Sequence, residues 1–369
     1  MSKIIRYPRR VLIRQSMRAL GRLLARLLAQ VQIEGQQNFP TKGPLIVVGN
    51  HTAAMEVVLM TIYTPWILEY MGSTDIPHEC FISAFMNSYG FIPVFRGNVE
   101  RASLQAGLEV LSQDGMLGLF PEGGIWEPNI RQAQSGVAWL SYHAQAPVLP
   151  IGFGAMQGAL ARMFRFERPS VKMVVGPLLP PVQVEPGRPR KLQLQAAADR
   201  IMDAVWELIP PEDRQQEQVI QDERFELHLA AFDRQGQPVE IPVELQPAHG
   251  PALSKLIHRT VLINNFIQNL KLPVTALKYL ADQPPLPELI QATESIQAYL
   301  EKDNPYYFTY RYGNREGKAM QAGVHEIQQL ARWALAQGLQ LKATPLRRFY
   351  VDNRADEIVL ERPSEYDKW

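Results

Sequence analysis

A histidine and a glutamate stand five residues apart, just after an apolar run near the start of the chain. The run Leu45–Val48 leads through Gly49 to Asn50 and His51, and Glu56 lies in the helical pattern that follows. A histidine held by a carboxylate is suited to act as a general base, because imidazole exchanges protons near neutral pH. In mid-helix a five-residue offset would separate the two side chains by about 140° around the axis. We therefore predict that His51 precedes the helix and that its ring folds back towards Glu56.

Two further apolar runs end in residues of the kind that line a substrate site. Glu122 and Gly123 follow the run Met116–Phe120, and glycine lets the backbone approach a ligand closely. Arg96 follows another apolar run, and its planar guanidinium suits bidentate binding of anionic oxygens such as those of a phosphate. If these runs are neighbouring strands, their ends converge on one face. The pattern thus predicts that all three residues lie near His51.

The first 210 residues alternate short apolar runs with helical periodicity, which is typical of a sheet covered by helices. The runs predicted to be strands are Leu45–Val48, Phe81–Ser83, Ile92–Phe95, Met116–Phe120, Val148–Phe153 and Val171–Val175. The helices predicted between them are Ala54–Tyr63, Ala102–Ser112, Arg131–His143 and Leu192–Leu208. We therefore predict an α/β fold in which a mixed sheet gathers reactive residues at its strand ends.

A composition change after Ile209 marks a domain boundary. Two prolines follow Ile209, and the sequence is then polar up to Arg224. We predict an N-terminal helix over residues 1–33, the α/β domain over 34–210, and a smaller α+β domain of unknown role over 220–369. The strands predicted in this last domain are Phe225–Phe232, Pro238–Leu245, Arg348–Val351 and Glu357–Leu360. Its predicted helices are Leu253–Leu270, Leu286–Leu300 and Gln321–Ala336.

Positive charge is concentrated in residues 1–33, which contain eight lysines and arginines and no acidic residue. The whole chain has a formal net charge of +1, so this +8 leaves −7 for the rest. Arginines recur every fourth residue from Arg10 to Arg26 with leucines between them, as in an amphipathic helix. We predict that residues 1–30 make a peripheral contact with the cytoplasmic face of a membrane. The alternative is a solvated basic face whose leucines pack on the helix's own domain.

The sequence predicts no cofactor, no metal and no nucleic-acid partner. His78, Glu79 and Cys80 are adjacent, and in an extended segment adjacent side chains alternate in direction and do not easily share one ion. The glycine-rich segment 152–158 leaves too little chain for the crossover helix of a dinucleotide-binding unit. The near-neutral chain, and a basic segment without interleaved aromatic residues, argue against nucleic-acid binding.

The segments around these residues together resemble the glycerolipid acyltransferase family, which includes the lysophosphatidic acid acyltransferases. Four matches occur in the family's order and spacing: Asn50-His51 with Glu56, Phe95-Arg96, Phe120-Pro121-Glu122-Gly123, and Val148-Leu149-Pro150-Ile151. There are two departures. Glutamate replaces the usual aspartate at position 56, as in the related lipid A late acyltransferases. Gly124-Ile125-Trp126 replaces the Thr-Arg-Ser that often follows the third motif.

The resemblance implies direct transfer of a fatty acyl group from acyl-CoA or acyl carrier protein to a hydroxyl of a lysophospholipid-like acceptor. His51 would be the general base and Glu56 its orienting carboxylate, with Asn50, Arg96, Glu122 and Gly123 in the substrate site. The alternative is a catalytically silent lipid-binding protein or membrane-associated scaffold that retains the fold. Release of free thiol from acyl-CoA in the presence of an acceptor distinguishes these two functions.

Overall fold

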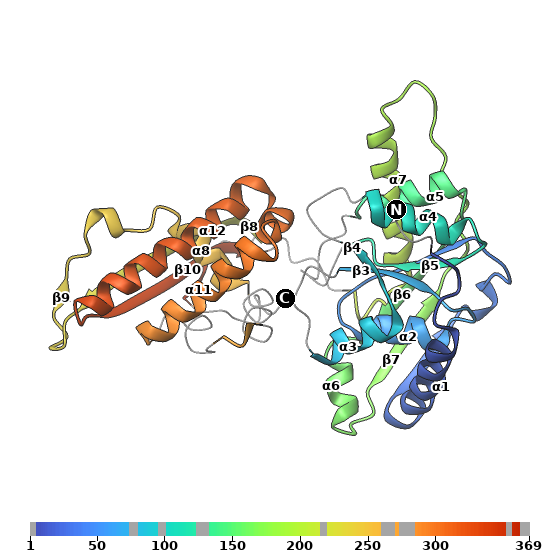
Figure 1. Ribbon diagram of the computed structural model, residues 1–369, viewed down its shortest axis with the longest axis horizontal. Coiled ribbons are helices and arrows are strands. Elements are labelled where there is room, and N and C mark those ends of the chain that lie inside the picture. Colours follow the sequence, from blue (N-terminus) through green and yellow to red (C-terminus); the bar gives the residue numbers. More distant parts are fainter. Residues whose placement is uncertain are drawn as a thin grey trace. The chain divides into compact units, whose positions relative to one another are not determined.

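The chain folds into two compact units in the computed structural model (Figure 1). Unit 1 contains the described residues up to Arg214, and unit 2 contains those from Ile220 onwards. The structure describes residues 5–73, 80–94, 101–122, 133–214, 220–259, 270–272, 285–351 and 356–361.

Unit 1 is built on a sheet in which all neighbouring strands are parallel except one pair. The strands are β1 (Gln30–Glu34), β2 (Leu45–Gly49), β3 (Glu69–Ser73), β4 (Ile92–Val94), β5 (Met116–Leu119), β6 (Val148–Gly154) and β7 (Ser170–Val175). Their order within the described part of the chain is β1-β7-β6-β2-β5-β3-β4, and β6 and β7 are the antiparallel pair. The carboxyl ends of β2, β5 and β6 therefore lie at one edge, which we call the active edge.

Helices cover both faces of this sheet (Figure 1). One layer contains α1 (Val11–Leu28), α2 (Met55–Tyr63), α3 (Cys80–Tyr89) and α6 (Ala159–Phe164), and the other contains α4 (Arg101–Leu111), α5 (Gly136–Ala144) and α7 (Arg190–Leu208). Strand β2 shows why both layers form. Leu45 and Val47 point into one core and Ile46 and Val48 into the other, and all four are fully buried. The predicted mixed α/β sheet covered by helices is thus confirmed.

Three predicted elements of secondary structure differ from the structure. The helix predicted over residues 1–33 ends at Leu28, and Gln30–Glu34 form β1. Residues 81–83 were expected to form a strand but belong to α3, because an apolar run this short does not reveal its period. Phe85 and Tyr89 stack one helical turn apart, with ring centroids 5.9 Å from each other, and Tyr89 is buried in the core. Residues 243–245 form a short 3₁₀ helix instead of the end of a strand, and the strand at Pro238 has only two residues.

Unit 2 is a four-stranded antiparallel sheet with helices packed on it. Its described strands are β8 (Ile220–Phe232), β9 (Pro238–Val239), β10 (Gln340–Val351) and β11 (Ile358–Leu360), in the order β11-β10-β8-β9. The helices are α8 (Gly250–His258), α11 (Leu286–Lys302) and α12 (Tyr307–Ala336), and α12 contains a non-helical Gly313 with φ of 79°. Alternate residues of β10, among them Leu341, Ala343 and Phe349, are buried.

Helix α1 packs on unit 1 through arginines, which is the reverse of the alternative in which its leucines pack on its own domain. Arg14 is completely buried, and its guanidinium forms two hydrogen bonds with the buried Glu69 at 2.6 and 2.8 Å. Arg9 donates to the same carboxylate at 2.7 Å. Burial alone would raise the pKa of Glu69, but the hydrogen bonds and charges of Arg14 and Arg9 outweigh burial and hold this pKa below its ordinary value.

The next two arginines of the stripe satisfy the last turn of α2. Arg18 donates to the carbonyls of Thr61 and Thr64, and Arg22 donates to the carbonyl of Ile62. The last carbonyls of a helix lack partners within the helix, so cationic donors there are stabilising. Arg14 and Arg18 therefore point into unit 1, and the apolar side chains of α1 that remain exposed are those of Val11, Leu12, Ile13, Leu20, Leu23, Leu24 and Leu27. The leucines are therefore free to make the predicted membrane contact, whereas Arg14 and Arg18 are used within unit 1.

Candidate active site

His51 lies at the active edge between the end of β2 and the start of α2, as its spacing from Glu56 required. Glu56 is fully buried in the first turn of α2, where its carboxylate accepts hydrogen bonds from the backbone N–H groups of Thr52 and Ala53, each at 2.9 Å. The Thr52 hydroxyl donates to it at 2.7 Å. A carboxylate at a helix N-terminus is favourable because it satisfies unpaired N–H groups and faces the positive end of the helix dipole.

The imidazole of His51 approaches Glu56 but does not form a hydrogen bond with it in this geometry. His51 Nδ1 lies 3.7 Å from Glu56 Oε2, which exceeds hydrogen-bond length. Nδ1 is buried and has no hydrogen-bond partner among the described residues. The ring is held by Phe120, on which it stacks with centroids 4.3 Å apart. The sequence did not predict this role for Phe120, although the residue is the first of the third motif.

Glu122 follows the end of β5, and its carboxyl group contacts the backbone of His51. Its Oε2 accepts a hydrogen bond from the backbone N–H of His51 at 2.8 Å. The pKa of Glu122 is raised to about 8, mainly by burial; the hydrogen bond from the N–H of His51 lowers it, and the negative charge of Glu56 adds to the rise. Glu122 is therefore mainly protonated at neutral pH. Its neighbour in the predicted site, Gly123, and the predicted anion-binding Arg96 lie outside the described residues.

Asn50 holds the loops at the active edge together. Its Nδ2 donates to the carbonyl of Phe153 at 3.1 Å, and its Oδ1 accepts from the N–H of Phe153 at 2.8 Å. These reciprocal bonds join the end of β2 to the end of β6, and the Asn50 side chain is buried. Asn50 therefore fixes the backbone that carries His51, in addition to lining the cavity beside it.

A cavity of about 270 Å³ opens beside the histidine. Asn50, Thr52 and Glu122 form one wall, and Met202 and Trp206 of α7 supply an apolar part. Its other polar side chains are Gln157, Arg162, Glu212 and Asp213. No carboxylate in the described part of the chain lies within ion-pair distance of Arg162, so its charge is available to a ligand. No sequence motif pointed to Arg162, which follows the fourth motif on the short helix α6.

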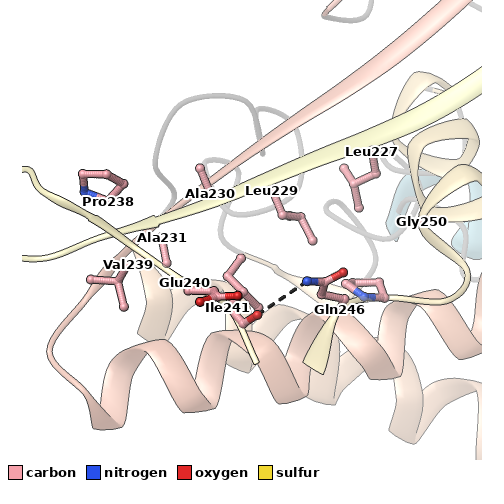
Figure 2. Close-up of a pocket in the computed structure, with 11 residues that line it drawn as sticks. Leu227, Leu229, Ala230, Ala231, Pro238, Val239, Glu240, Ile241, Gln246 and Gly250 are labelled. Atoms are coloured by element: carbon pink, nitrogen blue, oxygen red, sulfur yellow. Dashed lines mark hydrogen bonds between the residues drawn. The ribbon is translucent and has the colours of Figure 1, made fainter. Parts of the chain in front are cut away.

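A second cavity, of about 420 Å³, lies in unit 2 between β8, β9 and the start of α8 (Figure 2). Leu227 and Leu229 point to one side of β8 and Ala230 to the other, as strand alternation requires. Glu240 is its one ionisable lining residue, and Gln246 Nε2 lies 3.5 Å from the carbonyl of Ile241. This cavity therefore lacks the residues for acid–base chemistry that the active edge contains.

The described residues contain no group of three or more histidine, cysteine, aspartate or glutamate side chains placed to hold a metal ion. His78 and Glu79 lie outside them. None of the helices that the structure describes is long and apolar enough to span a bilayer.

Comparison with known proteins identifies the segment that carries this site. Residues 30–154 match the family model described as "Acyltransferase". Over 156 residues, 42% of this chain and 76% of the other, the sequence is 20% identical to a "1-acyl-sn-glycerol-3-phosphate acyltransferase" of Bacillus subtilis (strain 168). A solved 1-acyl-sn-glycerophosphate (LPA) acyltransferase, PlsC, from Thermotoga maritima shares 18% identity, with a TM-score of 0.36 over 52% of this chain and 78% of the other. The family model and the curated relative thus show that residues 30–154, which carry His51, Glu56 and Glu122, are similar to the lysophosphatidic acid acyltransferase-like family.

Proposed function

We propose that the protein transfers a fatty acyl group from the thioester of acyl-CoA or acyl carrier protein to a hydroxyl of a lysophospholipid-like acceptor. The observation that carries the proposal is the placement of His51 between two carboxyl groups at the edge of the cavity. His51 takes the acceptor's hydroxyl proton as the oxygen attacks the thioester carbonyl. The carbon–sulfur bond then breaks, and the imidazolium returns the proton to the leaving thiolate.

Glu56 supports this cycle through its charge. The 3.7 Å separation is too long for a hydrogen bond to neutral His51, but it is an ion-pair distance once the ring is protonated. Catalytic hydrogen bonds are often long without substrate and shorten in the productive complex. Because the carboxylate is anchored by Thr52 and Ala53, it stays in place while the ring changes charge.

The acceptor binds, in this proposal, in the cavity beside His51. Protonated Glu122 presents a carboxyl O–H that can donate to an acceptor oxygen, which an ionised carboxylate cannot do. Arg162 supplies a cation for a phosphate on the opposite wall, and Arg96 remains the family-based prediction for the same headgroup. Arg162 also compensates for the basic residue that is absent after the third motif.

A membrane location fits the exposed leucines of α1 better than its arginines. The buried guanidiniums of Arg14 and Arg18 are used within unit 1, so they do not reach lipid headgroups. A row of exposed leucines on one helix face is an apolar surface of the kind that inserts into a lipid interface. We propose that α1 contacts the cytoplasmic face of a membrane through this leucine face.

The second candidate is the catalytically silent lipid-binding protein. It is favoured by one observation: within the described part of the chain, the Glu56 carboxylate accepts its hydrogen bonds from Thr52 and Ala53 and none from the His51 ring. Thiol release from acyl-CoA, measured with and without lysophosphatidic acid, separates the two functions. Acceptor-dependent release by the wild type that is lost in His51→Ala supports the enzyme. Equal background release by both proteins, with lysolipid still bound, supports the silent protein.

A further inference from the structure

The turn that follows α6 exposes two aromatic side chains. Phe164 is 63% exposed and Phe166 is 77% exposed, although phenylalanine is normally among the more buried residue types. Arg165 lies between them, and Arg168 follows two residues later, both exposed. Arg165 pairs with Glu167 at 3.2 Å on the surface. We call residues 164–168 the aromatic turn.

The backbone of the aromatic turn does not need a phenylalanine at position 166. The N–H of Glu167 bonds to the carbonyl of Arg162, and the N–H of Phe166 bonds to the carbonyl of Met163. This pair of bonds is the Schellman motif, in which the residue at the position of Phe166 adopts a left-handed conformation and is usually glycine. Phe166 has φ of 61°, which is unfavourable for a bulky side chain. An exposed aromatic residue in a strained position indicates a role outside folding.

The sheet register places the aromatic turn at the active edge beside α1. The turn leads into β7, which runs antiparallel to β6, so that Lys172 pairs with Gly154 at the carboxyl end of β6. The N–H of Gln30, which directly follows α1, donates to the carbonyl of Pro169 at 2.9 Å. The C-terminal end of α1, which contains Leu24 and Leu27, is therefore adjacent to the aromatic turn. Arg162, which lines the cavity beside His51, lies in α6, the helix that leads into the aromatic turn.

We propose that the aromatic turn is a second membrane contact, which inserts Phe164 and Phe166 into the interface of a phospholipid bilayer beside the leucine face of α1. Aromatic rings favour the boundary between acyl chains and headgroups, and Arg165 and Arg168 give the turn a positive charge that suits anionic headgroups. Two contacts at one edge would set the mouth of the cavity against the lipid surface. The inference extends the membrane location proposed above, but its readout is binding, so it is tested separately from catalysis.

The test is co-sedimentation of the full chain with vesicles of phosphatidylcholine containing phosphatidylglycerol. The double variant Phe164→Ala, Phe166→Gly should lose roughly tenfold or more in partition coefficient, because two large apolar side chains no longer enter the lipid. Phe166→Trp should retain binding, since tryptophan also favours the interface. Phe166→Gly alone should melt at or above the wild-type temperature, because glycine relieves the left-handed strain.

Leu192→Ala is the matched control. Leu192 is 67% exposed but lies near the start of α7, about 24 Å along that helix from Leu208, whose side chain approaches Gly152 near the active edge. This variant should bind vesicles as the wild type does. Wild-type binding by the double variant would overturn the proposal, and so would a loss of binding that accompanies a lowered melting temperature in Phe166→Gly. Conversion of a dimer to a monomer without any change in vesicle binding would instead make the turn an interface between copies.

Discussion

Replacing Glu122 by glutamine should make the stability of the protein less dependent on pH. The pKa of Glu122 is raised by burial from 4.5 to about 8, so the folded state holds this proton more tightly than the unfolded state. The stabilising contribution is fully present below pH 4.5, decreases as the pH rises, and levels off above pH 8. One pKa unit corresponds to about 1.4 kcal/mol, so the wild type should lose about 3 kcal/mol between pH 5 and pH 8 through this group.

Glutamine imitates the protonated carboxyl group and can still accept the hydrogen bond from the N–H of His51. Urea unfolding of both proteins between pH 5 and pH 9 gives the difference in unfolding free energy, in which the other titrating groups cancel. The variant should be more stable than the wild type by about 1 kcal/mol at pH 5 and by about 4 kcal/mol at pH 8. Glu185→Gln is the control, because this side chain is 70% exposed. If the difference in unfolding free energy between Glu122→Gln and the wild type stays constant with pH, the raised pKa of Glu122 is refuted.

Four further changes test the site and its support. His51→Ala should fold normally and lower acceptor-dependent thiol release by roughly two to four orders of magnitude, as loss of a general base does; near-normal turnover would exclude this mechanism. Glu56→Asp should keep more activity than Glu56→Ala, with melting temperatures measured alongside, because alanine also removes the bonds to Thr52 and Ala53. Arg14→Ala should destabilise unit 1 by about 3–5 kcal/mol in urea unfolding, since it leaves the buried Glu69 charge with one partner fewer. Arg162→Ala should raise the KM for a phosphorylated acceptor more than the KM for the thioester donor, and equal effects on both would remove Arg162 from the acceptor site.

The sequence located well those elements whose residue pattern is compatible with only one type of secondary structure. The Leu45–Val48 run is apolar on both faces, so it had to be a central strand, and the angle between His51 and Glu56 around a helix excluded placing both in α2. The sequence could not show which groups donate hydrogen bonds to the Glu56 carboxylate. Its bonds with the N–H groups of Thr52 and Ala53 depend on the local turn, and they leave His51 Nδ1 at 3.7 Å. Nor does a sequence report how deeply Glu122 is buried, on which its raised pKa depends.

The orientation of α1 shows why amphipathic periodicity alone does not assign the two faces of a helix. The stripe of arginines predicts a solvent or headgroup face only if the surface beneath offers them no partners. Here β3 provides the buried carboxylate of Glu69, and the end of α2 provides carbonyls that need donors. Both lie more than 35 residues away along the chain, so no local pattern contains them. Because burying an unpaired charge costs far more than burying one that is paired and hydrogen-bonded, these partners allow the arginines to lie inside and leave the leucines outside. The charge that makes the N-terminus look suited to anionic lipid therefore serves mainly to fix the helix, and the apolar face it leaves exposed is the one that can enter the membrane.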